Sequence, residues 1–166
     1  MEAKEFLKAL SKVAPKKEDF DKYNLPDQYV NQSLETYVCS RKEYNDVLSG
    51  NNTVLQLLNL YDCSKMEIGN VRFLKDAIEF DDYFEIGSVE IDILVLNKIT
   101  LEIEVRDHDS VDYVIWPCTA NGGNLLDALI LCADFFAAKI KDPALEKNNK
   151  YIFDRVNECA EAAGGG

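Results

Sequence analysis

The sequence predicts an α+β domain, in which a mainly antiparallel sheet of about four to six strands in the middle of the chain packs with N- and C-terminal helices. Apolar residues recur at helical spacing near both ends of the chain, and they alternate with period two over 83–107. The length of 166 residues and the 47% content of hydrophobic residues fit a single domain. We expect this domain to cover 1–163, with a flexible glycine tail at 164–166.

The first part of the chain is predicted to be helical. Residues 2–13 form an amphipathic pattern that ends before Pro15, and a second helix is expected after Pro26, because proline suits the first turn of a helix. The run 41–49 predicts a further short helix, which ends in turn-forming residues. The inward side of the second helix is expected to carry Tyr29, Leu34, Tyr37 and Val38.

The middle of the chain reads mainly as strands. The apolar run 54–61 is short and follows a turn, which predicts a strand, whereas 64–77 fits no single pattern and leaves open a helix ahead of the next strand. Apolar and acidic residues alternate in 89–93, and the alternation resumes in 101–106. This pattern predicts a hairpin with one buried and one solvated face.

The assignment of faces fixes the expected register of this hairpin. If Ile91 and Ile93 share the buried face with Ile103 and Val105, odd-numbered residues lie opposite odd-numbered ones. That pairing permits a loop of three or five residues and excludes a loop of two or four. Residues 113–116 then predict one more strand, which brings Trp116 into the core.

The last part of the chain returns to helix. Asn121–Gly123 is expected to be a loop, and Asn124 is expected to cap the next helix together with Asp127. The buried side of that helix is expected to carry Leu125, Leu129, Cys132, Phe136 and Ile140. A final helix is predicted over about 148–163. Its inward residues are expected to be Ile152, Val156, Cys159 and Ala160.

The five cysteines contain no CxxC pair, which argues against zinc-ribbon and thioredoxin-like sites. Their odd number and wide spacing favour reduced structural thiols, and therefore a cytoplasmic protein. The charged N-terminus lacks the apolar stretch of a signal peptide. No apolar run approaches the roughly 18 residues of a membrane-spanning helix.

Acidic residues outnumber basic ones by 30 to 18, which gives a net charge of −12. Such a chain repels nucleic-acid phosphates and anionic lipid headgroups, so we expect it to bind neither nucleic acids nor membranes. Twelve of the acids lie within 76–112, where the only lysine and arginine are Lys98 and Arg106. This concentration of charge has two interpretations: a solvated sheet face, or a surface for a basic protein partner.

No catalytic, cofactor-binding or metal-binding residue is predicted. His108 is the single histidine, and a transition-metal site usually has a second His or Cys ligand, so we expect a surface or hydrogen-bonded histidine. No serine lies in a GxSxG motif, and Asn121–Gly123 has neither a GxGxxG pattern nor the lysine of a P-loop. A hydrolase with two carboxylates remains an alternative of low specificity, because a chain with thirty acids always contains some pair.

Several short motifs follow one another along the chain. They are Leu25-Pro26 with Tyr29, Gly50 followed by Val54-Leu55-Gln56-Leu57-Leu58, Ile86-Gly87-Ser88, the hairpin tip Asn97-Lys98-Ile99-Thr100-Leu101-Glu102, Asp107, and a helix opening Asn124-Leu125-Leu126-Asp127-Ala128-Leu129. Over about 19–135 this order resembles the SUKH superfamily, also called the Smi/Knr cell-wall-assembly-regulator type. Leu101 stands where that family usually has glycine, so a wider turn is expected.

The resemblance implies a non-enzymatic binding protein. Bacterial members of the superfamily are mostly immunity proteins for polymorphic toxins, many of which are nucleases, and fungal members act as signalling scaffolds. We therefore expect a cytoplasmic immunity-type protein that neutralises a toxin through its acidic sheet, with a scaffold that has no toxin partner as the alternative. The expected electrostatic contacts are Glu90, Asp92, Glu102, Glu104, Asp107 and Asp109.

Overall fold

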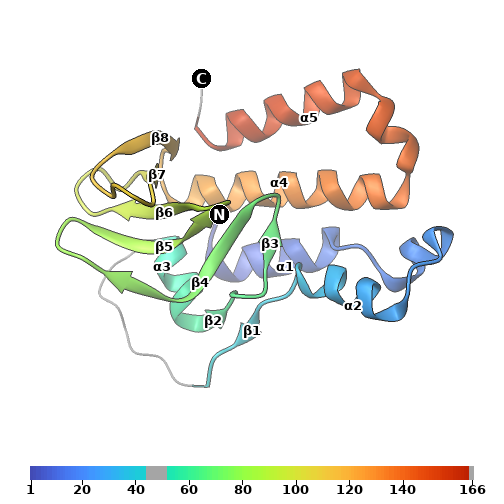
Figure 1. Ribbon diagram of the computed structural model, residues 1–166, viewed down its shortest axis with the longest axis horizontal. Helices are drawn as coiled ribbons and strands as arrows, with labels where there is room; N and C mark the ends of the chain where they lie inside the picture. The colour runs from blue at the N-terminus through green and yellow to red at the C-terminus, as the bar shows by residue number, and fades with distance from the viewer. Residues whose placement is uncertain (44–51, 165–166) are drawn as a thin grey trace.

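The computed structural model describes residues 1–43 and 52–164, and these ranges form an α+β fold, as predicted. A six-stranded antiparallel sheet occupies the middle of the chain, and helices precede and follow it. In Figure 1 the sheet lies on the left, and the long helix α4 extends from it between α1 and α5. The predicted sheet size and the predicted placement of the helices are therefore confirmed.

The helices of the described residues include both predicted N-terminal ones. Their bounds are α1 Ala3–Val13, α2 Asp27–Glu35, α3 Thr53–Leu60, α4 Gly122–Lys141 and α5 Asn149–Ala162, with short 3-10 helices at Lys17–Tyr23 and Pro143–Lys147. The inward side of α2 was predicted wrongly in part, because Val30 is its buried residue while the side chains of Tyr29 and Val38 are more than half exposed. The predicted helix 41–49 lies mostly outside the described residues, and Arg41 itself belongs to a strand.

The strands of the main sheet follow one another in space as they do in the chain. They are β3 Glu67–Ile68, β4 Val71–Glu79, β5 Tyr83–Val89, β6 Asp92–Asn97, β7 Ile103–Arg106 and β8 Val114–Thr119. A separate two-stranded ladder joins β1, Ser40–Arg41, to β2, Tyr61–Asp62. The helix considered for 64–77 is therefore wrong, because that run supplies β3 and most of β4.

Helix α3 contradicts the strand predicted for 54–61. The side-chain oxygen of Asn52 accepts a hydrogen bond from the backbone nitrogen of Val54 at 2.9 Å and so caps the helix. Val54, Leu55, Leu57 and Leu58 are all buried on one side of the helix, while Thr53, Gln56 and Asn59 are only partly buried and Leu60 is 38% exposed. The helix is eight residues long, and a short apolar run of this length fits a buried strand as well as two turns of helix, which is why its sequence predicts a strand.

The β6–β7 hairpin exists, but its predicted register is wrong. Ile93 pairs with Arg106 and Leu96 with Ile103, so odd-numbered residues face even-numbered ones. The backbone nitrogen of Asn97 donates to the carbonyl oxygen of Glu102, which leaves the four residues 98–101 as the loop. A four-residue loop is the length that the predicted faces excluded.

The error in register comes from a turn inside the run 89–93. Strand β5 ends at Val89, and β6 begins at Asp92. Between them Glu90 has φ 56° and Ile91 is 71% exposed, so the alternating run belongs to two strands joined by a turn. The face assignment for Ile91 was therefore wrong, and the residues of β6 that enter the core are Leu94 and Leu96.

The core lies between one face of the sheet and helices α1, α3 and α4. Leu94 and Leu96 from β6 pack there with Phe6 of α1 and Leu126 of α4, each at most 1% exposed. The first turns of α3 and α4 approach closely, because a Cβ on Gly122 would lie 2.9 Å from Cγ2 of Val54. Glycine at this position therefore permits the two helices to close one end of the core.

Helix α5 lies on the outside of α4 (Figure 1). It has no fully buried residue, and the predicted inward residues Val156 and Ala160 are exposed, Val156 to 56%. Cys159 does face α4, as predicted, and Tyr151 and Arg155 lie on the same side. Gly164 is not part of a free tail, since its backbone nitrogen donates to the carbonyl oxygen of Glu161 and a Cβ added to it would lie 2.9 Å from Cβ of Ala120. The other two tail residues, 165–166, lie outside the described ranges.

None of the helices in the described ranges combines the length and the apolar character needed to cross a lipid bilayer.

Candidate functional site

Four of the six predicted contact residues lie together at one end of the main sheet. Glu90 lies in the β5–β6 turn, Asp92 is the first residue of β6, and Asp107 and Asp109 belong to the loop between β7 and β8. The turn and the loop meet at His108, whose backbone nitrogen and ring Nδ1 lie 3.4 and 3.1 Å from Oδ1 of Asp92. We call this group, with Asp112 of the same loop, the acidic end: Glu90, Asp92, Asp107, Asp109 and Asp112.

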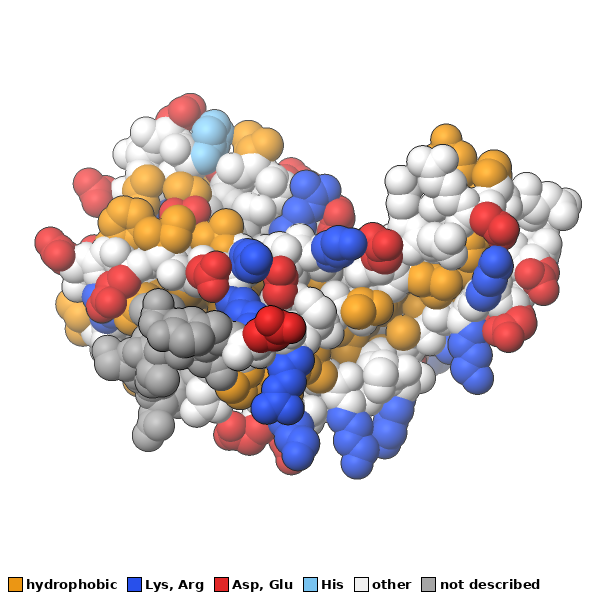
Figure 2. Space-filling model, turned by 90° about the horizontal axis from the view of Figure 1, so that it is seen from below, with side chains coloured by type: hydrophobic (Ala, Val, Ile, Leu, Met, Phe, Trp, Pro, Cys, Tyr) orange, Lys and Arg blue, Asp and Glu red, His pale blue; other side chains and the backbone are white. Residues whose placement is uncertain are grey.

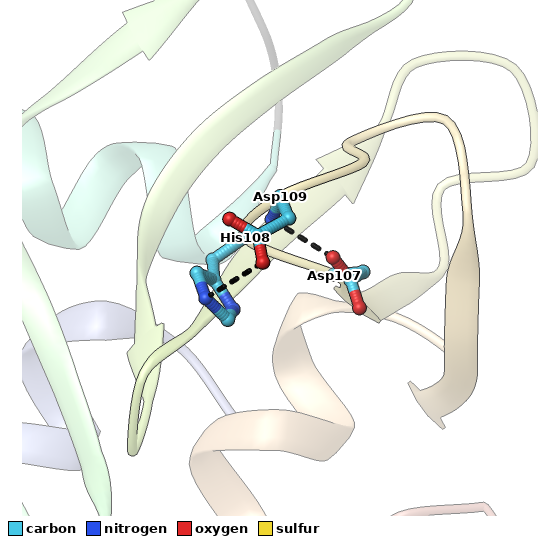
Figure 3. A group of neighbouring side chains, drawn as sticks. All are labelled: Asp107, His108 and Asp109. Carbon is cyan, nitrogen blue, oxygen red and sulfur yellow. Dashed lines mark hydrogen bonds and ion pairs between the residues drawn. The ribbon is translucent and has the colours of Figure 1, made fainter.

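Asp107 shapes the loop of the acidic end. Its Oδ1 accepts a hydrogen bond from the backbone nitrogen of Asp109 at 2.8 Å (Figure 3) and another from that of Ser110 at 2.9 Å, an arrangement typical of an Asx turn. The backbone nitrogen of Asp107 donates to the carbonyl oxygen of Tyr113, which closes the base of the loop. The carboxylate of Asp107 is therefore a structural group of the loop, while that of Asp109 projects into solvent with 86% of its surface exposed.

His108 is a hydrogen-bonded surface histidine, as the sequence predicts. Its Nδ1 faces Asp92, and its Nε2 lies 3.4 Å from Oδ2 of Asp109. The hydrogen bond to Asp92 is the main cause that raises the pKa of His108 above 6.5, and partial desolvation opposes it. The nearby carboxylates of Asp109 and Asp107 raise this pKa further.

The same loop contains the potential metal ligands of the described residues. One donor atom from each of Asp107, His108 and Asp109 lies within 4.8 Å of the others (Figure 3). The carboxylate of Asp107 already accepts two backbone hydrogen bonds, and both ring nitrogens of His108 face carboxylates. Hydrogen bonds within the protein thus account for this geometry, and the arrangement fits a charged interaction surface better than a metal centre.

The other two predicted contacts lie elsewhere. Glu102 follows the β6–β7 loop at the opposite end of the strands. Glu104 was expected on a solvated face but is only 6% exposed, and both Nε and Nη2 of Arg106 donate to its Oε2 at 2.9 and 2.8 Å. The solvated position predicted for Glu104 and Arg106 is therefore wrong, because these two side chains form a buried ion pair on the outer face of the sheet.

Arginine and lysine side chains pair with acids outside the acidic end. Lys98 bonds Glu79 at 2.8 Å, and Lys42 bonds Asp76 at 2.7 Å. Within residues 1–43 and 52–164, no lysine or arginine forms an ion pair with a member of the acidic end. Part of the acidic run found in the sequence is thus neutralised, and the acidic end keeps its charge apart from His108.

Exposed apolar side chains adjoin the acidic end. Ile91 lies in the β5–β6 turn and is 71% exposed, and Tyr113 ends the β7–β8 loop and is 62% exposed. Trp116 of β8 is 43% exposed, so its predicted place in the core is wrong. No periodicity marks these three residues as exposed, because each lies next to a turn or in a strand whose pairing with β7 is irregular.

Positive charge gathers on other elements. Figure 2 shows the histidine, coloured pale blue, at the upper margin of the molecule, and lysine and arginine side chains in a row along the lower margin. Helix α1 carries Lys4, Lys8 and Lys12, which are exposed, four residues apart, and without an ion pair to any described residue. Acidic side chains also lie between the basic ones over most of this face, so the acidic end is distinguished by having no lysine or arginine partner among the described residues.

A cavity of about 560 Å³ lies at the opposite end of the strands from His108. It is bounded by the first turns of α3 and α4 and by the β6–β7 loop. Glu79 is the only acid among its described lining residues, and Lys98 neutralises it while lying 4.7 Å from the centre of the Phe84 ring. A pair of facing carboxylates, which the hydrolase alternative requires, is not among these lining residues.

Comparison of the chain with family models, with curated proteins and with solved structures gave no match.

Proposed function

We propose that the protein is a binding protein that attaches to a cationic region of another protein through its acidic end. The observation that carries this proposal is the contact of Asp92 with His108, which brings the β5–β6 turn and the β7–β8 loop into one surface. Opposite charge on a partner speeds association and orients it, with gains of about 10 to 1,000-fold in rate at low salt.

The exposed apolar residues supply the second requirement of such a surface. Protein interfaces usually contain a few large apolar or aromatic anchors surrounded by polar residues. Ile91 and Tyr113 can serve as such anchors, because both are exposed and lie beside the carboxylates of the acidic end, Ile91 in the β5–β6 turn and Tyr113 in the β7–β8 loop. Glu102 and Glu104 are no longer part of the proposed contact, because of their distant and buried positions respectively.

The resemblance to the SUKH superfamily supports an immunity-type role, in which the partner is a toxin domain that the protein neutralises in the cytoplasm. Leu101 adds to this support. It stands where the family usually has glycine, and it has φ 64°, a backbone conformation that favours glycine. A toxin that binds nucleic-acid phosphates carries basic side chains, and the acidic end is complementary to them in charge.

The test begins with a pull-down from the native host, and the captured protein is then produced and its affinity measured over a range of salt concentrations. The test variant is Asp109→Lys with Asp112→Lys, because both residues are exposed loop residues. The matched control is Glu18→Lys with Asp21→Lys, which changes the net charge equally on a distant element. We expect the test variant to weaken binding by about tenfold or more at low salt and to reduce its salt dependence, with little effect of the control.

Equal affinity of the wild type and the test variant at every salt concentration would show that the acidic end is not the contact. The immunity role has its own test in growth assays. Expression of the captured partner alone should arrest growth, and co-expression of this protein should restore it. A partner that is harmless when expressed alone favours the scaffold function instead.

A further inference from the structure

Two cysteines face each other across the contact between α4 and α5. Sγ of Cys132 lies 3.5 Å from Sγ of Cys159, and both side chains are partly exposed. The residues are 27 positions apart in the chain, so a bond between them would close a long loop across the two helices. Oxidants in solution can reach this pair, because neither cysteine belongs to the fully buried core.

We propose that Cys132 and Cys159 are a redox-sensitive pair, which a hydroperoxide oxidises to a reversible disulfide that fixes α5 to α4. A disulfide holds its sulfur atoms about 2.05 Å apart, so the two atoms must approach by about 1.5 Å. Helix α5 can supply this movement, because it has no fully buried residue and its packing is against one side only.

The chemistry balances with hydrogen peroxide as the oxidant. The thiolate of Cys159 attacks one peroxide oxygen, the O–O bond breaks, and the leaving hydroxide takes a proton to become water, which leaves a sulfenic acid on Cys159. The sulfur of Cys132 then attacks the sulfenic sulfur, the S–O bond breaks, and the thiol proton of Cys132 joins the departing hydroxide as a second water. Two thiols are oxidised to one disulfide, and one peroxide is reduced to two waters.

The surroundings decide which sulfur reacts first. Burial and the neighbouring Cys159 raise the pKa of Cys132 to about 12, so Cys132 stays protonated and acts as the second, resolving thiol. Arg155 lies one turn before Cys159 on α5, and its positive charge partly offsets the rise in the pKa of Cys132. The guanidinium of Arg155 is ion-paired through Nη2 with Asp134 and through Nη1 with Glu158 at 2.6 Å, so these carboxylates offset much of its positive charge next to the sulfur pair.

The remaining cysteines differ from this pair in ways that the experiment can use. Cys63 is 0% exposed, and a hydrogen bond to Cys39 and its burial both raise the pKa of its thiol. Burial also raises the pKa of Cys118. We therefore expect Cys63 and Cys118 to stay reduced under conditions that oxidise Cys132 and Cys159.

The test treats the folded protein with hydrogen peroxide, alkylates the free thiols and measures the intact mass and the linked peptides. We expect a loss of about 2 Da before alkylation and a cross-link between the peptides that contain Cys132 and Cys159. Trypsin leaves Cys118 and Cys132 in one peptide, 107–139, so the mapping is done in a Cys118→Ser background. The other partner is the peptide 156–166.

Matched variants make the result specific. Cys132→Ser and Cys159→Ser should each abolish the 2 Da loss, whereas Cys39→Ser and Cys118→Ser should retain it. The unfolded chain in urea serves as the positive control for the oxidant. If the unfolded chain is oxidised and the folded wild type is not, or if the cross-link joins other cysteines, the proposal is wrong.

Hydrogen exchange tests the structural consequence. In the oxidised protein the amides of α5 should exchange more slowly, on the order of tenfold, and dithiothreitol should restore the faster exchange. The exchange of β6 should not change. Unchanged exchange in α5 of the cross-linked protein would contradict the fixing of this helix. The orientation of the exposed Phe153 and Val156 on the outer side of α5 is what the disulfide would fix.

Discussion

The guanidinium of Arg106 directs both Nε and Nη2 at a single carboxylate oxygen of Glu104, two residues earlier on the same strand. Both residues are at most 6% exposed. Asn97 donates its side-chain amide to the other oxygen of Glu104 at 2.8 Å, and the guanidinium carbon of Arg106 lies 4.7 Å from the centre of the Tyr83 ring. The charges of Glu104 and Arg106 are therefore paired before any partner binds.

Replacing Arg106 with methionine should destabilise the protein strongly. The substitution leaves the carboxylate of Glu104 buried without its cation, which typically costs about 3–5 kcal/mol. Urea denaturation followed by circular dichroism measures the change in the free energy of unfolding. The double variant Glu104→Gln with Arg106→Met should recover more than half of the loss, because it removes the buried charge as well. A double variant as unstable as the single one would show that packing, and not charge, determines the effect.

Replacing Leu101 with glycine should stabilise the protein slightly. Leu101 has φ 64° and is 53% exposed, so its side chain contributes little burial while its backbone has a left-handed conformation. Relief of that strain is worth about 1–2 kcal/mol, and the greater freedom of glycine in the unfolded chain offsets about half of it. Thermal unfolding should therefore show an unchanged or higher midpoint for Leu101→Gly. Ile99→Gly, in the same loop, is the control and should lower the midpoint.

The N-cap of α4 is Asn121, whereas the sequence predicts Asn124 as the cap. The side-chain oxygen of Asn121 accepts from the backbone nitrogen of Asn124 at 3.0 Å, and the helix begins at Gly122. Asn121→Ala should lower the free energy of unfolding by about 1 kcal/mol, measured by urea denaturation. Asn124→Ala removes instead a hydrogen bond to the carbonyl oxygen of Ala162, so its main effect should be faster hydrogen exchange in α5.

Titration of His108 should occur above pH 6.5, because the hydrogen bond to Asp92 raises its pKa. A raised folded-state pKa means that the folded chain binds the proton more tightly, so the stabilisation is complete below pH 6.5 and is lost as the pH rises through the raised value. NMR titration of the single imidazole measures this directly. Asp92→Asn should lower the pKa of His108 more than Asp109→Asn does. The same His108 pKa in the wild type and in Asp92→Asn would show that the hydrogen bond to Asp92 is not the cause of the shift.

The sequence predicts the fold class and the outer helices because their patterns are amphipathic. It fails at α3 and around Glu90 for two physical reasons. Helix α3 is only eight residues long, and over so short a run an apolar pattern fits a buried strand as well as a helix. At Glu90 and Ile91 the chain turns without glycine or proline, so an alternating run hides the boundary between two strands.

The candidate site is predictable only in part for a related reason. The positions of Asp107 and Asp109 in a loop follow from their place between two strands. The burial of Glu104 does not follow, because it depends on the β6–β7 register and on Arg106 and Asn97 as partners. Exposure of Ile91 and Trp116 likewise depends on the turn and on the irregular pairing of β8, which a pattern of residue types does not encode.

The strand order has a consequence for the protein during its synthesis. Every strand of the main sheet leaves the ribosome before α4 does, and 22 residues separate the end of β8 at Thr119 from the end of α4 at Lys141. At typical rates of translation this gap lasts roughly 1–4 s. During that interval the apolar residues of the sheet that later pack against α4 are exposed to solvent. Chaperones that bind exposed apolar segments can therefore bind the nascent chain at this stage.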